Sequence, residues 1–387
     1  PALFDESVKK YGKEDFLSFV DQKALTYNDV NNEIIKLKAL LATHGIEKGD
    51  RVVVQVEKSI EAIVLYLACL RAGAIYIPLN TAYTANEVAY FLQDAEPRVF
   101  VCTPQAKASL AGLAATAGVA RIVSLGQAGD GELMAGLEAR PVSEQVVQVA
   151  GDELAAILYT SGTTGRSKGA MLSHANLASN AQVLHDYWHW QPTDVLLHAL
   201  PVFHVHGLFV ALHCALLGGS RVLFMPRFDL PTVIAALPQA TVMMGVPTYY
   251  TRLLAEPAFT ADKCAGMRLF ISGSAPLLAD TFAAFEARTG EDDFECRLPN
   301  AFLADPPLEQ VVAKSYEFGT RGEWREINYR LGFFHTENRN DMKLSQYAFA
   351  IRDPEPVSAF WHKLGLPEVQ IDNPVLGEPR YYGEVAD

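Results

Sequence analysis

Short apolar strand patterns and helical patterns alternate along the first 290 residues of this 387-residue chain. RVVVQV at 51–56 and IYIPLN at 75–80 are rich in β-branched residues. Between them, SIEAIVLYLACLRAGA at 59–74 has the length and apolar content of a buried helix that ends near Gly73. Two strands joined through a helix pair in parallel within one sheet. The alternation therefore predicts an α/β fold with mostly parallel sheets and helices on both faces.

The alternation continues to residue 273 and stops near Gly290. A helical pattern at 27–46 has Asn28 as a candidate N-cap and Gly45 as a candidate stop. Beyond Gly290 the chain becomes acidic and proline-interrupted, with 18 acidic and 10 basic residues in 291–387. We therefore place a domain boundary near 290. The further strand candidates before it are 98–103, 154–160, 195–201, 221–225, 241–246 and 269–273.

Composition and charge exclude several classes of protein. The net charge of −13 opposes a nucleic-acid partner, because phosphate binding needs clustered Lys and Arg. The five cysteines are scattered, which opposes a disulfide framework or a cysteine zinc site and favours a reducing compartment. No apolar run reaches the roughly 18 residues that span a bilayer, and the N-terminus lacks the apolar core of a signal peptide. We expect a cytoplasmic protein without a membrane span, and the sequence does not predict its oligomeric state.

The stretch YTSGTTGRSKGAMLSH at 159–174 follows a strand pattern and leads, as a flexible turn, into a helical one. Its glycines permit close backbone approach, and its amides, hydroxyls and basic side chains suit a phosphate chain. The pattern G-x-x-x-x-G-K-[ST] is absent, because Arg166 follows Gly165 and Gly169 follows Lys168. A Walker-type kinase or GTPase is therefore disfavoured. On composition alone, the better interpretation is a surface loop, since such loops are common.

The order of several motifs changes that interpretation. The chain resembles the adenylate-forming acyl-CoA synthetase superfamily, whose signature is a Ser/Thr/Gly-rich loop that ends in Lys-Gly. Other segments resemble that superfamily in its own order: LRAGAIYIPLNTAYTANEVAYFLQDAEPRVFV, LPVFHVHGL, GVPTYYTRLL and MRLFISGSAPL. Among its members, the malonyl-CoA synthetases are the most similar, over residues 1 to about 290. The resemblance implies that 1–290 is the large N-terminal AMP-binding domain of this fold in incomplete form.

The resemblance also implies the reaction and its co-substrates. ATP and a carboxylic acid, here malonate or methylmalonate, give an acyl-adenylate and pyrophosphate, with Mg²⁺ as counter-ion. CoA then displaces AMP. By motif position, the implied ATP-binding residues are Ser161, Gly162, Thr163, Thr164, Gly165 and Lys168 at the phosphates, and Gly273, Ser274 and Ala275 beside the adenine.

The implied acyl site depends on residues from three motifs. His204 and Lys168 are the implied catalytic residues, and His206 is placed to line the acyl pocket. For either histidine the alternative is a hydrogen-bonded structural residue. Malonate has a second carboxylate, which must be paired with a cation when it leaves water. A planar bidentate donor such as arginine suits it, which makes Arg252 the candidate.

Two further side chains complete the candidate site for malonate. Ser272 is a candidate hydroxyl donor to the second carboxylate. Arg268 is a second candidate for its cation, although a charge at the start of a strand is more often structural. For Arg252 itself the alternative is a solvated position on a helix face.

The chain departs from the family pattern after FEARTG. The family continues with a motif that serves phosphate and magnesium, and later with a ribose-binding motif and a mobile domain that carries a catalytic lysine. Residues 291–387 resemble none of these family motifs. We therefore expect adenylation to be impaired, because magnesium and the catalytic lysine stabilise the charge that develops in the transition state. An alternative is a non-catalytic nucleotide-binding remnant of a truncated or fused chain.

The tail resembles a different fold. We expect an irregular linker at 291–340 and a small α+β fragment at 341–387. SQYAFAIRDPEPVSAFWHKLGLPEVQID resembles the first strand and helix of a glyoxalase-like vicinal oxygen chelate protein, with Gln346 at the position of a metal ligand. The alternative is an amphipathic helix behind an apolar strand. A metal-dependent lyase or isomerase is the third function class considered. It ranks last, because a single ligand does not hold a catalytic ion.

Overall fold

The computed structural model describes residues 1–20, 22–140, 142, 147–160 and 167–289. It also describes the backbone of four later strands. The chain divides into two compact units, Pro1–Leu303 and Ala304–Asp387, and each is described by itself.

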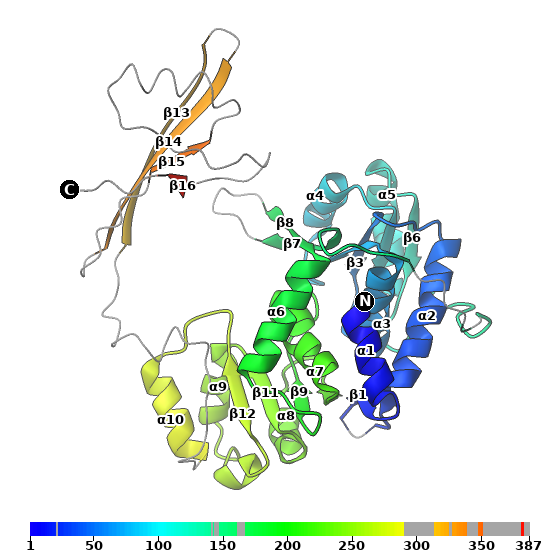
Figure 1. The fold of residues 1–387 in the computed structure, drawn as a ribbon, viewed down its shortest axis with the longest axis vertical. Helices are drawn as coiled ribbons and strands as arrows, with labels where there is room; N and C mark the ends of the chain where they lie inside the picture. The colour runs from blue at the N-terminus through cyan, green and yellow to red at the C-terminus, as the bar shows by residue number, and fades with distance from the viewer. Residues whose placement is uncertain are drawn as a thin grey trace. The chain divides into compact units, whose positions relative to one another are not determined.

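The first sheet of the N-terminal unit has the strand order β6-β5-β3-β4-β7-β8. All of its neighbours pair in parallel except β7 and β8, which are antiparallel. Alternate residues of β3 face opposite layers: Val52 belongs to the same apolar cluster as Leu65 of α3, whereas Val53 belongs to the cluster that contains Val88 of α4. Helices therefore cover both faces (Figure 1). The strands are β3 Arg51–Gln55, β4 Ile75–Pro78, β5 Val99–Cys102, β6 Arg121–Ser124, β7 Leu154–Thr160 and β8 Lys168–Ser173, and the helices are α2 Tyr27–Thr43, α3 Ile60–Ala72, α4 Ala85–Ala95 and α5 Pro104–Thr116.

The second sheet has the order β12-β11-β9-β10-β1-β2 and is parallel except for the β1–β2 pair. Leu196 of β9 belongs to the same apolar cluster as Val52 of β3, so the two sheets share one core. Leu197 faces the other way and belongs to a second apolar cluster, which contains Leu253 of α9 and Phe285 of α10.

The strands of the second sheet are β1 Asp15–Phe19, β2 Leu25–Thr26, β9 Val195–His198, β10 Arg221–Phe224, β11 Val242–Gly245 and β12 Leu269–Ser272. The helices of this half are α1 Ala2–Tyr11, α6 His174–Tyr187, the π-helix η1 His206–Ala211, α7 Leu212–Gly218, α8 Leu230–Ala236, η2 Leu237–Gln239, α9 Pro247–Leu254, η3 Ala261–Cys264 and α10 Ala279–Thr289 (Figure 1).

The predicted fold class is confirmed, and two local predictions are wrong. The N-cap of α2 is Thr26, which forms a capping box with Asp29, and Asn28 lies inside the helix. Lys168 does not lie in a turn that leads directly into a helix, because Lys168–Ser173 forms β8 alongside β7. Within the described ranges, no helix is long and apolar enough to cross a bilayer.

The C-terminal unit contains an antiparallel sheet with the order β13-β14-β15-β16. Its strands are β13 Ala313–Trp324, β14 Ile327–Asn338, β15 Tyr347–Ala350 and β16 Tyr381–Tyr382. The sequence pattern indicated a strand at the position of β15 but not the hairpin of β13 and β14. Gln346 and the helix predicted after it lie outside the described residues.

Candidate functional site

The candidate site lies where β9, β11 and β12 end. Because these strands are parallel neighbours, their carboxyl ends meet at one edge of the sheet, which is where α/β folds bind ligands. The segment after β9 carries His204 and His206, and the segment after β12 carries Gly273 and Ser274. The Gly273 amide donates to the Gly245 carbonyl at 3.0 Å, which fixes the start of the second segment.

His206 makes direct contact with the segment after β12. Its Nδ1 lies 3.3 Å from the Ser274 hydroxyl. A Cβ atom on Gly273 would lie 2.9 Å from His206 Cε1, so glycine allows the imidazole to lie against the backbone. Ser274 has a left-handed φ of 69°, a conformation in which non-glycine residues store strain. The structure therefore brings His206 together with two predicted site residues, Gly273 and Ser274, that lie 67 and 68 positions further along the chain.

His206 is neutral near pH 7. Its side chain is 6% exposed, and burial, with the nearby His204 as a smaller cause, lowers the pKa of His206 to about 4. The His206 amide lies 3.5 Å from Nδ1 of His204, whose residue is exposed. A neutral imidazole at this position can donate or accept a hydrogen bond to a ligand but does not add a charge.

The segment between β9 and η1 folds back on itself. A Cβ atom on Gly207 would overlap the Pro201 carbonyl oxygen. The Gly207 carbonyl accepts a hydrogen bond from His198 Nε2 at 2.8 Å. The close approach at Gly207 therefore determines where His204 and His206 lie.

Gly207→Ala is expected to lower the free energy of unfolding by about 2 kcal/mol, because the new methyl group overlaps a backbone oxygen that cannot rotate away. Urea unfolding at pH 7 measures the change. The matched control is Gly112→Ala in α5, where nothing lies within 4 Å of the new Cβ. That control should be neutral or stabilising by up to about 1 kcal/mol. Equal stability of Gly207→Ala and wild type would show that the contact does not restrain the segment.

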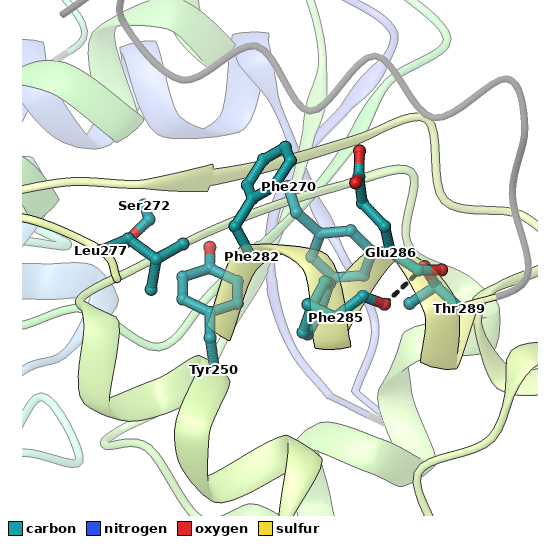
Figure 2. A pocket seen from close by; sticks show the side chains of 8 residues that line it. All are labelled: Tyr250, Phe270, Ser272, Leu277, Phe282, Phe285, Glu286 and Thr289. Carbon is teal, nitrogen blue, oxygen red and sulfur yellow. Dashed lines mark hydrogen bonds between the residues drawn. The ribbon is translucent and has the colours of Figure 1, made fainter. Parts of the chain in front are cut away.

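The two predicted malonate ligands, Arg252 and Ser272, have other surroundings than the His206 contact. Arg252 is exposed on α9, and its guanidinium carbon lies 4.8 Å from the centroid of the Phe228 ring. The Ser272 hydroxyl is buried without a hydrogen-bond partner. Ser272 lines a largely aromatic pocket that does not include Arg252 or His206 among its lining residues (Figure 2). The pocket is lined by Tyr250, Phe270, Ser272, Leu277, Phe282, Phe285, Glu286 and Thr289.

Arg268, the second candidate for the carboxylate, has a structural partner. Its Nε and Nη2 lie 3.0 and 2.6 Å from the two carboxylate oxygens of Asp194. This bidentate pair joins the starts of β9 and β12, at the opposite end of these strands from His206. The ion pair places Arg268 in the support of the sheet rather than in the candidate site.

Helix α4 holds the two strands that flank the phosphate-loop sequence. Tyr90 donates from its hydroxyl to the Ser167 carbonyl at 2.8 Å, and Tyr159 donates to Asp94 at 2.6 Å. Lys168 is exposed at the start of β8. The sequence did not single out Tyr90 and Asp94. The one feature that could have indicated them is their spacing, since residues four apart share a helix face. The predicted ATP ligands Ser161, Gly162, Thr163, Thr164 and Gly165 lie outside the described residues.

The described part of the chain contains no group of three or more His, Cys, Asp or Glu side chains that could hold a metal ion.

Comparisons with known proteins agree with the arrangement of this unit. The sequence profile of the AMP-binding enzyme family matches residues 4–300. Feruloyl-CoA synthase of an Amycolatopsis species is 32% identical over 259 residues, which are 66% of this chain and 50% of the relative. The mitochondrial malonate–CoA ligase ACSF3 of Mus musculus is 31% identical over 301 residues, 73% of this chain and 50% of the relative.

Solved structures give the same result. The crystal structure of ATP-bound MatB from Rhodopseudomonas palustris superposes with a TM-score of 0.71 at 46% sequence identity, covering 75% of this chain and 58% of MatB. The chain spans about half the length of the curated relatives that it matches.

Proposed function

This chain belongs to the AMP-binding enzyme family, and from that premise we propose that residues 1–290 are the incomplete large domain of an AMP-forming acid–CoA ligase that takes malonate. The observation that carries the proposal is the contact of His206 with Gly273 and Ser274 at the carboxyl edge of the sheet. The similarity to ATP-bound MatB supports ATP as the nucleotide, and the similarity to malonate–CoA ligase ACSF3 supports the acid.

The proposed reaction has two steps and no protein nucleophile. In the first, a malonate carboxylate oxygen attacks the α-phosphorus of ATP, an oxygen–phosphorus bond forms, and the bond to pyrophosphate breaks. In the second, the thiol sulfur of CoA attacks the acyl carbon and AMP leaves, while the thiol proton passes to solvent. Positioning and charge stabilisation supply the catalysis in both steps.

The proposed roles follow the chemistry of each side chain. Lys168 offsets the negative charge of the phosphates, together with the backbone and hydroxyl groups of 161–165. Gly273 lets the adenine approach the backbone. Neutral His206 and the neighbouring His204 border the acyl group, and Arg252 pairs with the second carboxylate of malonate. Mg²⁺ enters with ATP as its counter-ion.

The second candidate function is nucleotide binding without turnover. It is favoured by residues 291–387, which do not resemble the family motif that follows residue 290. We keep the boundary near 290, and the glyoxalase-like origin of 341–387, as parts of the proposal. For the same reason we expect slow adenylation by this chain.

The test is ATP binding by calorimetry together with malonate-dependent ATP–pyrophosphate exchange by the full chain. Weak exchange that requires malonate is the expected result. Lys168→Ala should reduce it about tenfold, because one charge-assisted contact to the phosphates is lost. Arg252→Ala should reduce exchange with malonate about tenfold but leave exchange with propionate, which has no second carboxylate, unchanged.

The exposed Lys13 supplies the matched control, and Lys13→Ala should not alter exchange. ATP binding without exchange would favour the second candidate function. A folded, monodisperse chain that neither binds ATP nor exchanges pyrophosphate would contradict both.

A further inference from the structure

Lys58 is a buried lysine that contacts the segment after β9, which carries His204 and His206. It lies immediately before Ser59, the N-cap of α3, and is 6% exposed. Its Nζ lies 2.8 Å from each of three acceptors: His198 Nδ1, the His198 carbonyl and the Leu200 carbonyl. The sequence gives no sign of this burial, since lysine is usually exposed.

The hydrogen bonds assign the protons of this network. The Gly207 carbonyl can only accept, so His198 must carry its proton on Nε2, 2.8 Å away. His198 Nδ1 is then an acceptor, and Lys58 must donate to it. An ammonium group has three N–H bonds, one for each of the three acceptors, and the His198 carbonyl also accepts from the Met225 amide at 3.0 Å.

Burial opposes the charge on Lys58, and other contacts favour it. Burial lowers the pKa of Lys58 well below its usual value and lowers the pKa of His198 as well. The three acceptors and the face of Phe224, whose ring centroid lies 4.3 Å from Nζ, stabilise the ammonium. The low pKa of His198 keeps its imidazole neutral and able to accept from Lys58.

The network joins the two ends of one segment. Lys58 holds the Leu200 carbonyl directly, and it holds the Gly207 carbonyl through His198. His204 and His206 lie between these two points. The Pro201 carbonyl, which packs against Gly207, leaves the segment little room to adjust.

We propose that Lys58 is a positioning residue that holds residues 199–207 in the conformation in which His206 contacts Gly273 and Ser274. The proposal rests on the proposed function only where it assigns the segment to the acyl site. Without Lys58, His198 Nδ1 and the Leu200 carbonyl lose the donor that Lys58 supplies, whereas the His198 carbonyl keeps the Met225 amide as a donor. Lys58 binds the carboxyl end of β9, so the segment after β9 should open locally while β11 stays folded.

The experiment compares Lys58→Met with wild type in the full chain by hydrogen exchange. Methionine keeps the length of the side chain and removes its donors. Deuterium uptake in 199–211 should become at least tenfold faster, whereas uptake in β11 should stay within twofold of wild type. Lys13→Met, at an exposed position, is the matched control and should change neither.

A binding measurement separates positioning from a merely structural role. The dissociation constants of AMP and of malonyl-sulfamoyl-adenosine, a stable analogue of the acyl-adenylate, are measured for both chains. Lys58→Met should weaken binding of the analogue about tenfold and of AMP less than threefold, since only the analogue reaches the acyl side. Lys58→Arg, which retains a cation and donors, should restore at least part of the difference.

Two outcomes would overturn the proposal. One is unchanged exchange of 199–211 in Lys58→Met, and the other is an equal increase in β11, which would indicate general loosening. If Lys58→Met does not fold, His198→Asn makes the same comparison, because it breaks the link from Lys58 through His198 to Gly207 and leaves Lys58 bound to the Leu200 carbonyl. If wild type binds neither nucleotide, the proposed function fails, and the exchange measurement still decides the role of Lys58.

Discussion

Lowering the pH from 7 to 5 is expected to reduce the free energy of unfolding by an amount on the order of 5 kcal/mol. Burial lowers the pKa of His174, His206 and His213 to about 4 in the folded chain. In the unfolded chain the pKa of histidine is about 6.5. Between these values the unfolded state binds protons that the folded state does not. The stability is therefore present above pH 6.5 and is lost as the pH falls.

The size follows from the three groups. At pH 5 the pH lies about 1.5 units below the unfolded pKa of each histidine, which is still neutral when folded. Each buried histidine therefore costs about 2 kcal/mol, and the half-buried His174 costs less because solvent screens it. His198, whose pKa burial also lowers, acts in the same direction.

Urea unfolding at several pH values measures the effect, and its slope gives the number of protons taken up. His174→Gln should reduce that number by about one, because glutamine does not titrate. Leu177→Ala is the control: it removes buried apolar atoms in α6 but no imidazole, so it should lower stability equally at every pH. Stability that stays constant or rises between pH 7 and pH 5 would show that these histidines become protonated in the folded state.

The fold was largely predictable because its strands are buried on both faces. Val52, Val53 and Val54 alternate between two apolar clusters, and a run of this kind has few other stable arrangements. Strand β8 was missed because four of its six residues are exposed, and its place is set by pairing with β7. The local sequence of 168–173 does not indicate that this segment pairs with β7.

The site was predictable only where motifs supplied it. His206 and Gly273 were identified by resemblance, and the structure adds the contact between them. Lys58 and His198 lie 140 positions apart, and nothing in either local sequence indicates the other. Arg268 could be assigned to a substrate or to the protein until Asp194 was placed beside it. Long-range pairing of polar groups therefore required the structure.

Removing the Asp194 carboxylate is expected to cost about 3 kcal/mol of unfolding free energy. Asp194 is 2% exposed and accepts from four donors: Arg268 Nε and Nη2, the Thr241 hydroxyl and the Gln191 amide. These donors come from the starts of β9, β11 and β12 or from residues beside them. Asp194→Ala leaves a half-buried guanidinium and two polar groups without their acceptor, although partial exposure of Arg268 lowers the expected cost.

A double-mutant cycle tests whether the pair itself is responsible. Asp194→Ala, Arg268→Met and the double variant are unfolded in urea, with Asp186→Ala at an exposed carboxylate as the control. If the bidentate contact dominates, the double variant should lose at least about 1 kcal/mol less than the sum of the single variants. Strict additivity would mean that Asp194 acts mainly through Thr241 and Gln191. The Asp194 ion pair would then not explain the position of Arg268. Its structural role in the sheet, in place of a role in binding an acidic substrate, would no longer follow.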